Sequence, residues 1–206
     1  MKDKLVIFDF DGVIVNTHDV SFGLNQKTNP HLTPELYSQM SHGNFYASFE
    51  SDTPLLKFIA NPTFSEEYGR AIQTLPPPQG INEMIVSLSK NHHLSIVSSA
   101  DETCIANFLK KEELVTYFNE ILGANVHKSK VIKLQKLLNK YDFKKEQAVF
   151  ITDTLGDIKE AHEVGIKSIG VLWGLHDRET LARGNPEIII DVPLLLEQTI
   201  EKVLNK

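Results

Sequence analysis

Leu5-Val6-Ile7-Phe8, followed by Asp9-Phe10-Asp11-Gly12, is a continuous apolar run that ends in two acids and a glycine. A run that is apolar at every position, rather than at alternate positions, is typical of a strand covered on both faces. Val149-Phe150-Ile151 repeats this pattern later in the chain. Strands of this kind belong to a parallel sheet that lies between two layers of helices. The stretch therefore predicts an α/β fold.

Short apolar runs alternate with helical patterns along most of the chain. In each helical segment the apolar residues recur about every 3.6 positions. The expected strands are 4–10, 93–98, 120–122, 148–152, 168–172 and 187–190. The expected helices are 81–91, 101–111, 129–141, 155–164, 177–183 and 193–204. We expect a three-layer, Rossmann-like core with a mainly parallel sheet.

One region, residues 16–79, lacks any strand pattern. Thr33-Pro34-Glu35 is a helix start, with a capping hydroxyl followed by proline at the first helical position. The region closes with Pro76-Pro77-Pro78, which ends a helix and forms a stiff linker. Because it is far too long for a plain loop, we predict a small all-α cap inserted after the first strand. The predicted domains are then 1–15 and 80–206 for the core and 16–79 for the cap.

Composition narrows the class of protein further. The chain has 206 residues, of which 41% are hydrophobic and 23% charged, as in an ordinary globular protein. Its 27 acidic and 21 basic residues give a net charge of −6, which argues against a nucleic-acid partner. No signal peptide or membrane helix is evident, and the single cysteine, Cys104, fits a reducing compartment. We therefore expect a cytoplasmic protein without a membrane partner, either a monomer or a small homo-oligomer.

Two pairs of acids follow predicted strands. Asp9 and Asp11 end the first strand, and Asp153 and Asp157 follow the strand at 148–152. Turn formation or helix capping could explain one acid of a pair, but hardly both pairs. The carboxyl ends of parallel strands meet at one edge of the sheet, where ligands bind in open α/β folds. Four carboxylates gathered there would repel one another unless a cation relieved them, and oxygen ligands suit Mg²⁺.

Hydroxyl and lysine side chains follow two other segments. Ser98 ends the strand at 93–98, and Ser99 follows it. Taken alone, Ser98 is better explained by helix capping or turn formation, but at the carboxyl edge of the sheet a hydroxyl and nearby amides can bind a phosphate oxygen. Lys128 and Lys130 precede the helix at 129–141. A lysine is usually a solvated charge, but one that reached an anionic site would neutralise a phosphoryl group. Lys130 is preferred because it lies directly before the periodic apolar run.

Taken in order, these motifs resemble those of the haloacid dehalogenase-like hydrolase superfamily. Asp9-Phe10-Asp11-Gly12-Val13 is similar to its first motif, Ser98 to its second, Lys130 or Lys128 to its third, and Asp153-Thr154-Leu155-Gly156-Asp157 to its fourth. The helical insertion resembles the cap of the phosphoglycolate-phosphatase-like branch. One departure is that many members have a Lys-Pro pair at the third motif, which this chain lacks.

The resemblance implies a mechanism. Asp9 would attack phosphorus and form an aspartyl-phosphate, and Asp11 would protonate the leaving oxygen and later activate water. The cofactor would be Mg²⁺, held by Asp9, the backbone carbonyl of Asp11 and Asp153, with Asp157 close by. Ser98, Ser99 and the motif lysine would bind the phosphate.

The expected function is Mg²⁺-dependent hydrolysis of a small phosphorylated metabolite. A phosphosugar mutase is one alternative, because it uses the same four motifs. A non-catalytic phospho-acceptor or structural module is an alternative of a different class.

Overall fold

The computed structural model describes residues 2–50 and 58–205. Within them, six parallel strands form one sheet in the order β3-β2-β1-β4-β5-β6. The six expected strands are confirmed, with ends that shift by at most two residues. The strands are β1 (Leu5–Phe8), β2 (His93–Val97), β3 (Glu120–Leu122), β4 (Ala148–Thr152), β5 (Lys167–Val171) and β6 (Ile188–Ile190).

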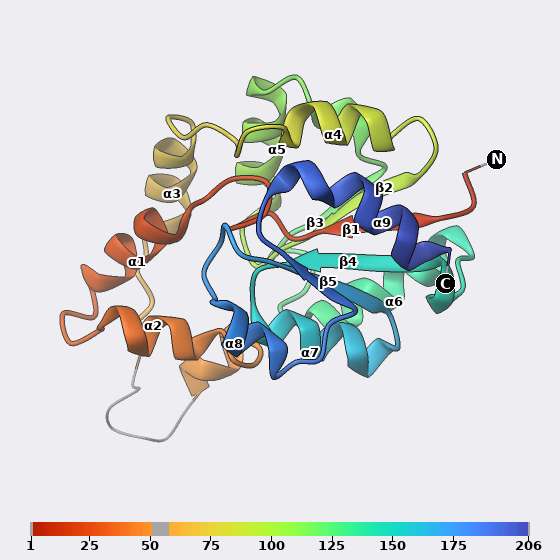
Figure 1. Cartoon of the computed structure of the whole chain (residues 1–206). Coiled ribbons are helices and arrows are strands. Elements are labelled where there is room, and N and C mark those ends of the chain that lie inside the picture. The colour runs from red at the N-terminus through yellow and green to blue at the C-terminus, as the bar shows by residue number, and fades with distance from the viewer. Residues whose placement is uncertain (1, 51–57, 206) are drawn as a thin grey trace.

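Helices cover both faces of the sheet, which confirms the three-layer α/β architecture (Figure 1). On one face lie α4 (Ile81–Leu88), α5 (Glu102–Lys111) and α9 (Leu196–Leu204). On the other lie α6 (Lys130–Tyr141) and α7 (Leu155–Val164). The short helix α8 (Arg178–Ala182) packs on α7. None of the helices in the described residues is long and apolar enough to cross a membrane.

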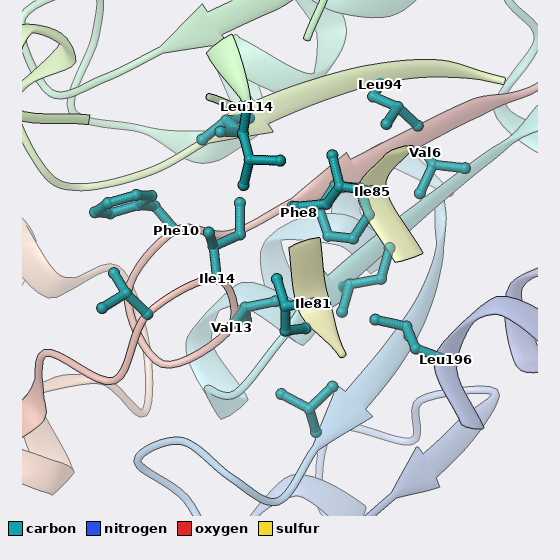
Figure 2. Close-up of a cluster of buried hydrophobic side chains, with 14 of the residues drawn as sticks. Val6, Phe8, Phe10, Val13, Ile14, Ile81, Ile85, Leu94, Leu114 and Leu196 are labelled. Atoms are coloured by element: carbon teal, nitrogen blue, oxygen red, sulfur yellow. The ribbon is translucent and has the colours of Figure 1, made fainter. Parts of the chain in front are cut away.

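The two faces of β1 contribute to different parts of the core. Val6 and Phe8 join the larger cluster with α4, α5 and α9 (Figure 2), whereas Leu5 and Ile7 join a second cluster with α6 and α7. All four side chains are fully buried. This arrangement explains why the run is apolar at every position, since both faces of the strand are covered.

The regular elements that the structure describes between β1 and α4 are all helices, and we call this stretch the helical segment. It contains α1 (His18–Gln26), α2 (Pro34–Met40), a 3₁₀ helix η1 (Phe45–Glu50) and α3 (Phe64–Ile72). These elements gather at the end of the sheet to which the strand arrows point (Figure 1). Residues 51–57 of the predicted cap lie outside the described residues. The division into a 16–79 cap and a core of 1–15 and 80–206 remains a prediction.

The strand order places β1 at the centre of the sheet, between β2 and β4. The chain winds outward from β1 in both directions, so β1 is the switch point where ligands bind in such sheets. Phe8 pairs with Ile96 of β2 and Ile151 of β4. Residues one or two positions beyond these three therefore emerge together at the carboxyl edge, and they include Asp9, Ser98 and Asp153.

Candidate active site

Asp9 lies directly beyond β1 and is almost fully buried, with 5% of its surface exposed. Its backbone N–H donates to the Ile151 carbonyl at 2.8 Å, which extends the sheet by one residue. Its carboxylate accepts from the Phe10 N–H at 2.7 Å and from Lys130 Nζ at 2.8 Å. Burial raises the pKa of Asp9 well above its usual range, and the Lys130 charge only partly offsets this effect.

Lys130 is the first residue of α6, which Ser129 caps by accepting from the Ile132 N–H. Its ammonium group lies between two carboxylates, 2.8 Å from Asp9 Oδ2 and 2.6 Å from Asp157 Oδ2. Burial by itself would lower the pKa of Lys130, but the charges of Asp157 and Asp9 outweigh it and raise that pKa. Lys130 is therefore a permanent, enclosed cation.

Lys128, the other candidate for the motif lysine, lies elsewhere. Its side chain is exposed, and its Nζ lies 5.2 Å from the centre of the Tyr46 ring. It does not line the cavity that contains Asp9. The structure thus brings Lys130, and not Lys128, to the acidic residues.

Asp153 and Asp157 follow β4, but neither caps α7. The capping residue is Thr154, whose hydroxyl accepts from the Asp157 N–H, so helix capping does not explain either acid. Asp157 accepts from Lys130 and from the Thr152 hydroxyl at 2.7 Å. Burial alone would raise the pKa of Asp157, but the Lys130 charge together with side-chain hydrogen bonds to Asp9, Lys130 and Thr152 outweighs burial and lowers that pKa.

Asp153 carries the feature most relevant to a metal. Its Oδ2 accepts from the Leu175 N–H at 2.7 Å, whereas its buried Oδ1 has no hydrogen-bond partner within residues 2–50 and 58–205. Burial raises the pKa of Asp153 to about 7. Gly12 and Gly174 fit closely around it, since a Cβ at either glycine would lie within 2.3 Å of the Asp153 carboxyl oxygen Oδ2. The chain thus encloses a carboxylate without neutralising it.

This arrangement fits a hard cation. The available donors are carboxylate and carbonyl oxygens, which Mg²⁺ prefers, and an unpartnered buried oxygen is stabilised by a metal ion. Across the described residues no three Asp, Glu, His or Cys side chains are preassembled as a metal site. The reason is geometric, because Asp9 and Asp157 are both directed at Lys130.

The Asp11 carboxylate is hydrogen-bonded to two residues of the helical segment and to one residue beyond β2. Its Oδ1 accepts from the hydroxyls of Thr17 and Tyr68, and its Oδ2 accepts from the Ser98 hydroxyl at 3.4 Å. Ser98 is fully buried, its oxygen accepts from the Ala100 N–H, and it does not line the cavity. Ser99 does line it. Of the two serines predicted to bind phosphate, Ser99 therefore lines the cavity and Ser98 does not.

Sequence patterns did not identify several residues around the site. Lys133, one helical turn beyond Lys130, is fully buried and donates to the carbonyl oxygen of Ser98. Glu160 accepts from the Lys130 N–H at 3.0 Å. His176 accepts from the Leu155 N–H at 2.9 Å. No local motif marks these residues, because their partners come from distant parts of the chain.

The acidic residues line one cavity of about 270 Å³ between the sheet edge and the helical segment. Asp9, Asp11, Lys130, Asp153 and Asp157 all contribute to it. Chemically, the cavity combines a carboxylate at a strand end, an enclosed cation and an oxygen site that lacks a positive partner.

Comparisons with known proteins identify a family and related chains. The family model described as "Haloacid dehalogenase-like hydrolase" matches residues 6–171. A phosphoglycolate phosphatase of Synechococcus elongatus is 22% identical, covering 98% of this chain and all of the relative. A pyrophosphatase, PpaX, of Bacillus pumilus is 24% identical and covers 90% of each chain.

A solved structure shows the same fold. It is a predicted phosphatase from Clostridium acetobutylicum, with a TM-score of 0.77 and 20% identity, covering 98% of this chain and 100% of the other. The family match extends over most of the chain, including the β1 and β4 motifs that carry the acids. The chain belongs to the haloacid dehalogenase-like hydrolases, in the branch that resembles phosphoglycolate phosphatases.

Proposed function

We propose that the chain is a Mg²⁺-dependent phosphatase that hydrolyses a phosphate monoester of a small metabolite through an aspartyl-phosphate on Asp9. The observation that carries the proposal is the environment of Asp9. Its carboxylate lies 2.8 Å from the Lys130 ammonium and lines the same cavity as the unpartnered oxygen of Asp153. The phosphatases among the curated relatives support the same reaction type.

Asp9 supplies the nucleophile. One of its oxygens forms a bond to phosphorus while the bond from phosphorus to the alcohol oxygen breaks. Lys130 stays protonated throughout and neutralises negative charge as the phosphoryl group moves onto Asp9. Ser99 lines the cavity and is the better placed of the two serines to contact phosphate, while Ser98 positions Asp11.

Asp11 transfers protons in both steps. As a carboxylic acid it gives its proton to the departing alcohol oxygen, and as a carboxylate it then takes a proton from the attacking water. Thr17 and Tyr68 fix the direction of its carboxyl group. The water then releases inorganic phosphate and restores Asp9.

Mg²⁺ would be held by Asp9, the Asp11 carbonyl and Asp153, with Asp157 nearby. It would supply the positive charge that lets an anionic phosphate approach an anionic carboxylate. The expected setting is the cytoplasm, where small phosphorylated metabolites are the partners.

The test is release of inorganic phosphate from acetyl phosphate, with and without Mg²⁺. We expect wild-type turnover to require the ion and Asp9→Asn to lose at least about a thousandfold in kcat, because the amide is not a nucleophile. Asp3→Asn, an exposed acid near the N-terminus, is the matched control. Residual activity of Asp9→Asn above about a thousandth would contradict the role of Asp9.

Measuring inorganic phosphate released from a hexose phosphate addresses the mutase alternative. A mutase moves the phosphoryl group within a sugar phosphate and releases little inorganic phosphate. Retention of phosphate on the sugar during turnover of a hexose phosphate would therefore favour the mutase.

A further inference from the structure

The helical segment contributes an aromatic wall to the cavity. Six of its side chains that line the cavity are aromatic, namely Tyr37, Phe45, Tyr46, Phe58, Phe64 and Tyr68. Several of these rings pack on one another. The Phe64 and Tyr68 rings stack with their centres 5.5 Å apart, and the Tyr37 and Phe45 rings lie nearly perpendicular with their centres 5.9 Å apart. We call these six residues the aromatic wall.

The three tyrosine hydroxyls of the aromatic wall are bonded to the protein. Tyr46 donates to the Ser99 carbonyl at 2.7 Å, and Tyr68 donates to Asp11. Tyr37 is hydrogen-bonded to Ser21 and Asn25, and burial raises its pKa. The wall therefore presents ring surface, rather than hydroxyl groups, to whatever occupies the cavity.

The charges in the cavity are strongly unbalanced. Five acids line it, Asp9, Asp11, Asp153, Asp157 and Glu160, whereas Lys130 is the one lysine or arginine among its described lining residues. Lys130 is already paired with two of these acids. The described lining residues from the helical segment include no lysine or arginine, so a second negative charge on the substrate would meet no cation on that side of the cavity.

His18, which also lines the cavity, does not change this balance. Burial lowers its pKa below the ordinary value, so it is neutral at pH 7. The cavity is also small, since its 270 Å³ lies just below the range of about 300–1,000 Å³ that is usual for ligand sites. It suits a phosphate group together with one modest substituent.

We propose that the preferred substrates are phosphate monoesters whose alcohol is uncharged and carries a single apolar ring. This inference rests on the proposed phosphatase function and names its substrate class. The ring packs against the aromatic wall, where aromatic pairs gain stability beyond that of simple burial. Alcohols with a carboxylate or a second phosphate are disfavoured, because no lysine or arginine among the described lining residues of the helical segment can pair with them.

The experiment compares kcat/KM for three substrates in Mg²⁺. Benzyl phosphate carries an uncharged ring, 2-phosphoglycolate carries a carboxylate on an alkyl group of similar reactivity, and acetyl phosphate is small enough to report the chemistry alone. We expect benzyl phosphate to exceed 2-phosphoglycolate by about tenfold or more. Equal or better turnover of 2-phosphoglycolate would overturn the inference.

Acetyl phosphate distinguishes a failure of the proposed substrate class from a failure of the proposed phosphatase function. Hydrolysis of acetyl phosphate without a preference for benzyl phosphate would overturn the substrate class and leave the phosphatase function standing. Failure to hydrolyse all three would overturn the function and the substrate class together.

A pair of variants tests the aromatic wall itself. Phe64→Leu keeps an apolar side chain but removes a ring, and we expect the ratio of kcat/KM for benzyl phosphate to that for acetyl phosphate to fall about three- to tenfold. Phe143→Leu is the control, because Phe143 packs on His93 away from the cavity. An unchanged ratio in Phe64→Leu, or an equal fall in Phe143→Leu, would contradict stacking on the wall.

Discussion

Lys130 shows how a buried acid can be kept ionised inside a protein. Burial favours the protonated form of a carboxyl group, but for Asp157 the Lys130 ammonium 2.6 Å away, together with hydrogen bonds, outweighs burial and lowers the pKa. Removing one member of such a group leaves the other charges buried and unpaired, which is far more costly than the loss of an exposed salt bridge. The charge on Lys130 is therefore important both for the fold and for the proposed chemistry.

The two candidate lysines differ enough for a direct comparison. We expect Lys130→Met to lower kcat/KM for acetyl phosphate at least about a hundredfold, because the charge that faces Asp9 is lost. Lys128→Met removes an exposed lysine and should retain most of the wild-type activity. Circular dichroism of both variants distinguishes a lost fold from a lost charge. A larger defect in Lys128→Met would reject the assignment of Lys130.

The first turn of α7 is a docking point for the helical segment. The Gly156 N–H donates to the Ser41 carbonyl at 2.8 Å, and His176 Nε2 lies 3.0 Å from the Ser38 carbonyl at the end of α2. A Cβ at Gly156 would lie 2.1 Å from the Gly43 carbonyl oxygen. The glycine between the two acids of the β4 motif thus allows close contact between α7 and residues 41–43.

Alanine substitutions at two helical glycines test this contact. Gly156→Ala should push residues 41–43 away from α7, which increases amide hydrogen exchange in that segment and raises KM. Gly23→Ala in α1 is the control, because a Cβ there meets no atom within 4 Å. Alanine is favoured over glycine within a helix, so Gly23→Ala should raise the free energy of unfolding by about 0.5–1 kcal/mol. Unchanged exchange at residues 41–43 in Gly156→Ala would argue against docking.

The elements were more predictable than the contacts between them. The strands and core helices followed from local patterns, such as the continuous apolar run of β1 and the recurrence of apolar residues about every 3.6 positions in the helices. The four acidic positions could be placed at one sheet edge because topology alone brings strand ends together. The bond from Tyr68 to Asp11 spans 57 residues and depends on how α3 packs, which no local pattern encodes.

The acidic cavity links the folding of the whole chain to ion binding. Asp153 is buried with one oxygen unpartnered among the described residues, so the protein without metal carries an electrostatic cost. A ligand that binds only the folded state raises the free energy of unfolding, by about 2.7 kcal/mol at 100 times its dissociation constant. The stability of the molecule should therefore depend on the divalent cation concentration even without substrate.

Thermal unfolding of wild type and Asp153→Asn at pH 7.5 tests this link without reference to activity. For a chain of this size, saturating Mg²⁺ should raise the wild-type Tm by about 5–10 °C relative to NaCl of equal ionic strength. Asp153→Asn should lose most of that increase, because the amide is a weaker ligand. Its Tm without metal should equal or exceed that of the wild type, because one buried charge has been removed while an oxygen remains for the Leu175 N–H.

Asp3→Asn is the control and should show the same Mg²⁺-dependent increase in Tm as the wild type. An undiminished Mg²⁺ effect in Asp153→Asn would place the ion elsewhere, and the proposed role of the β4 acids would then have to be abandoned.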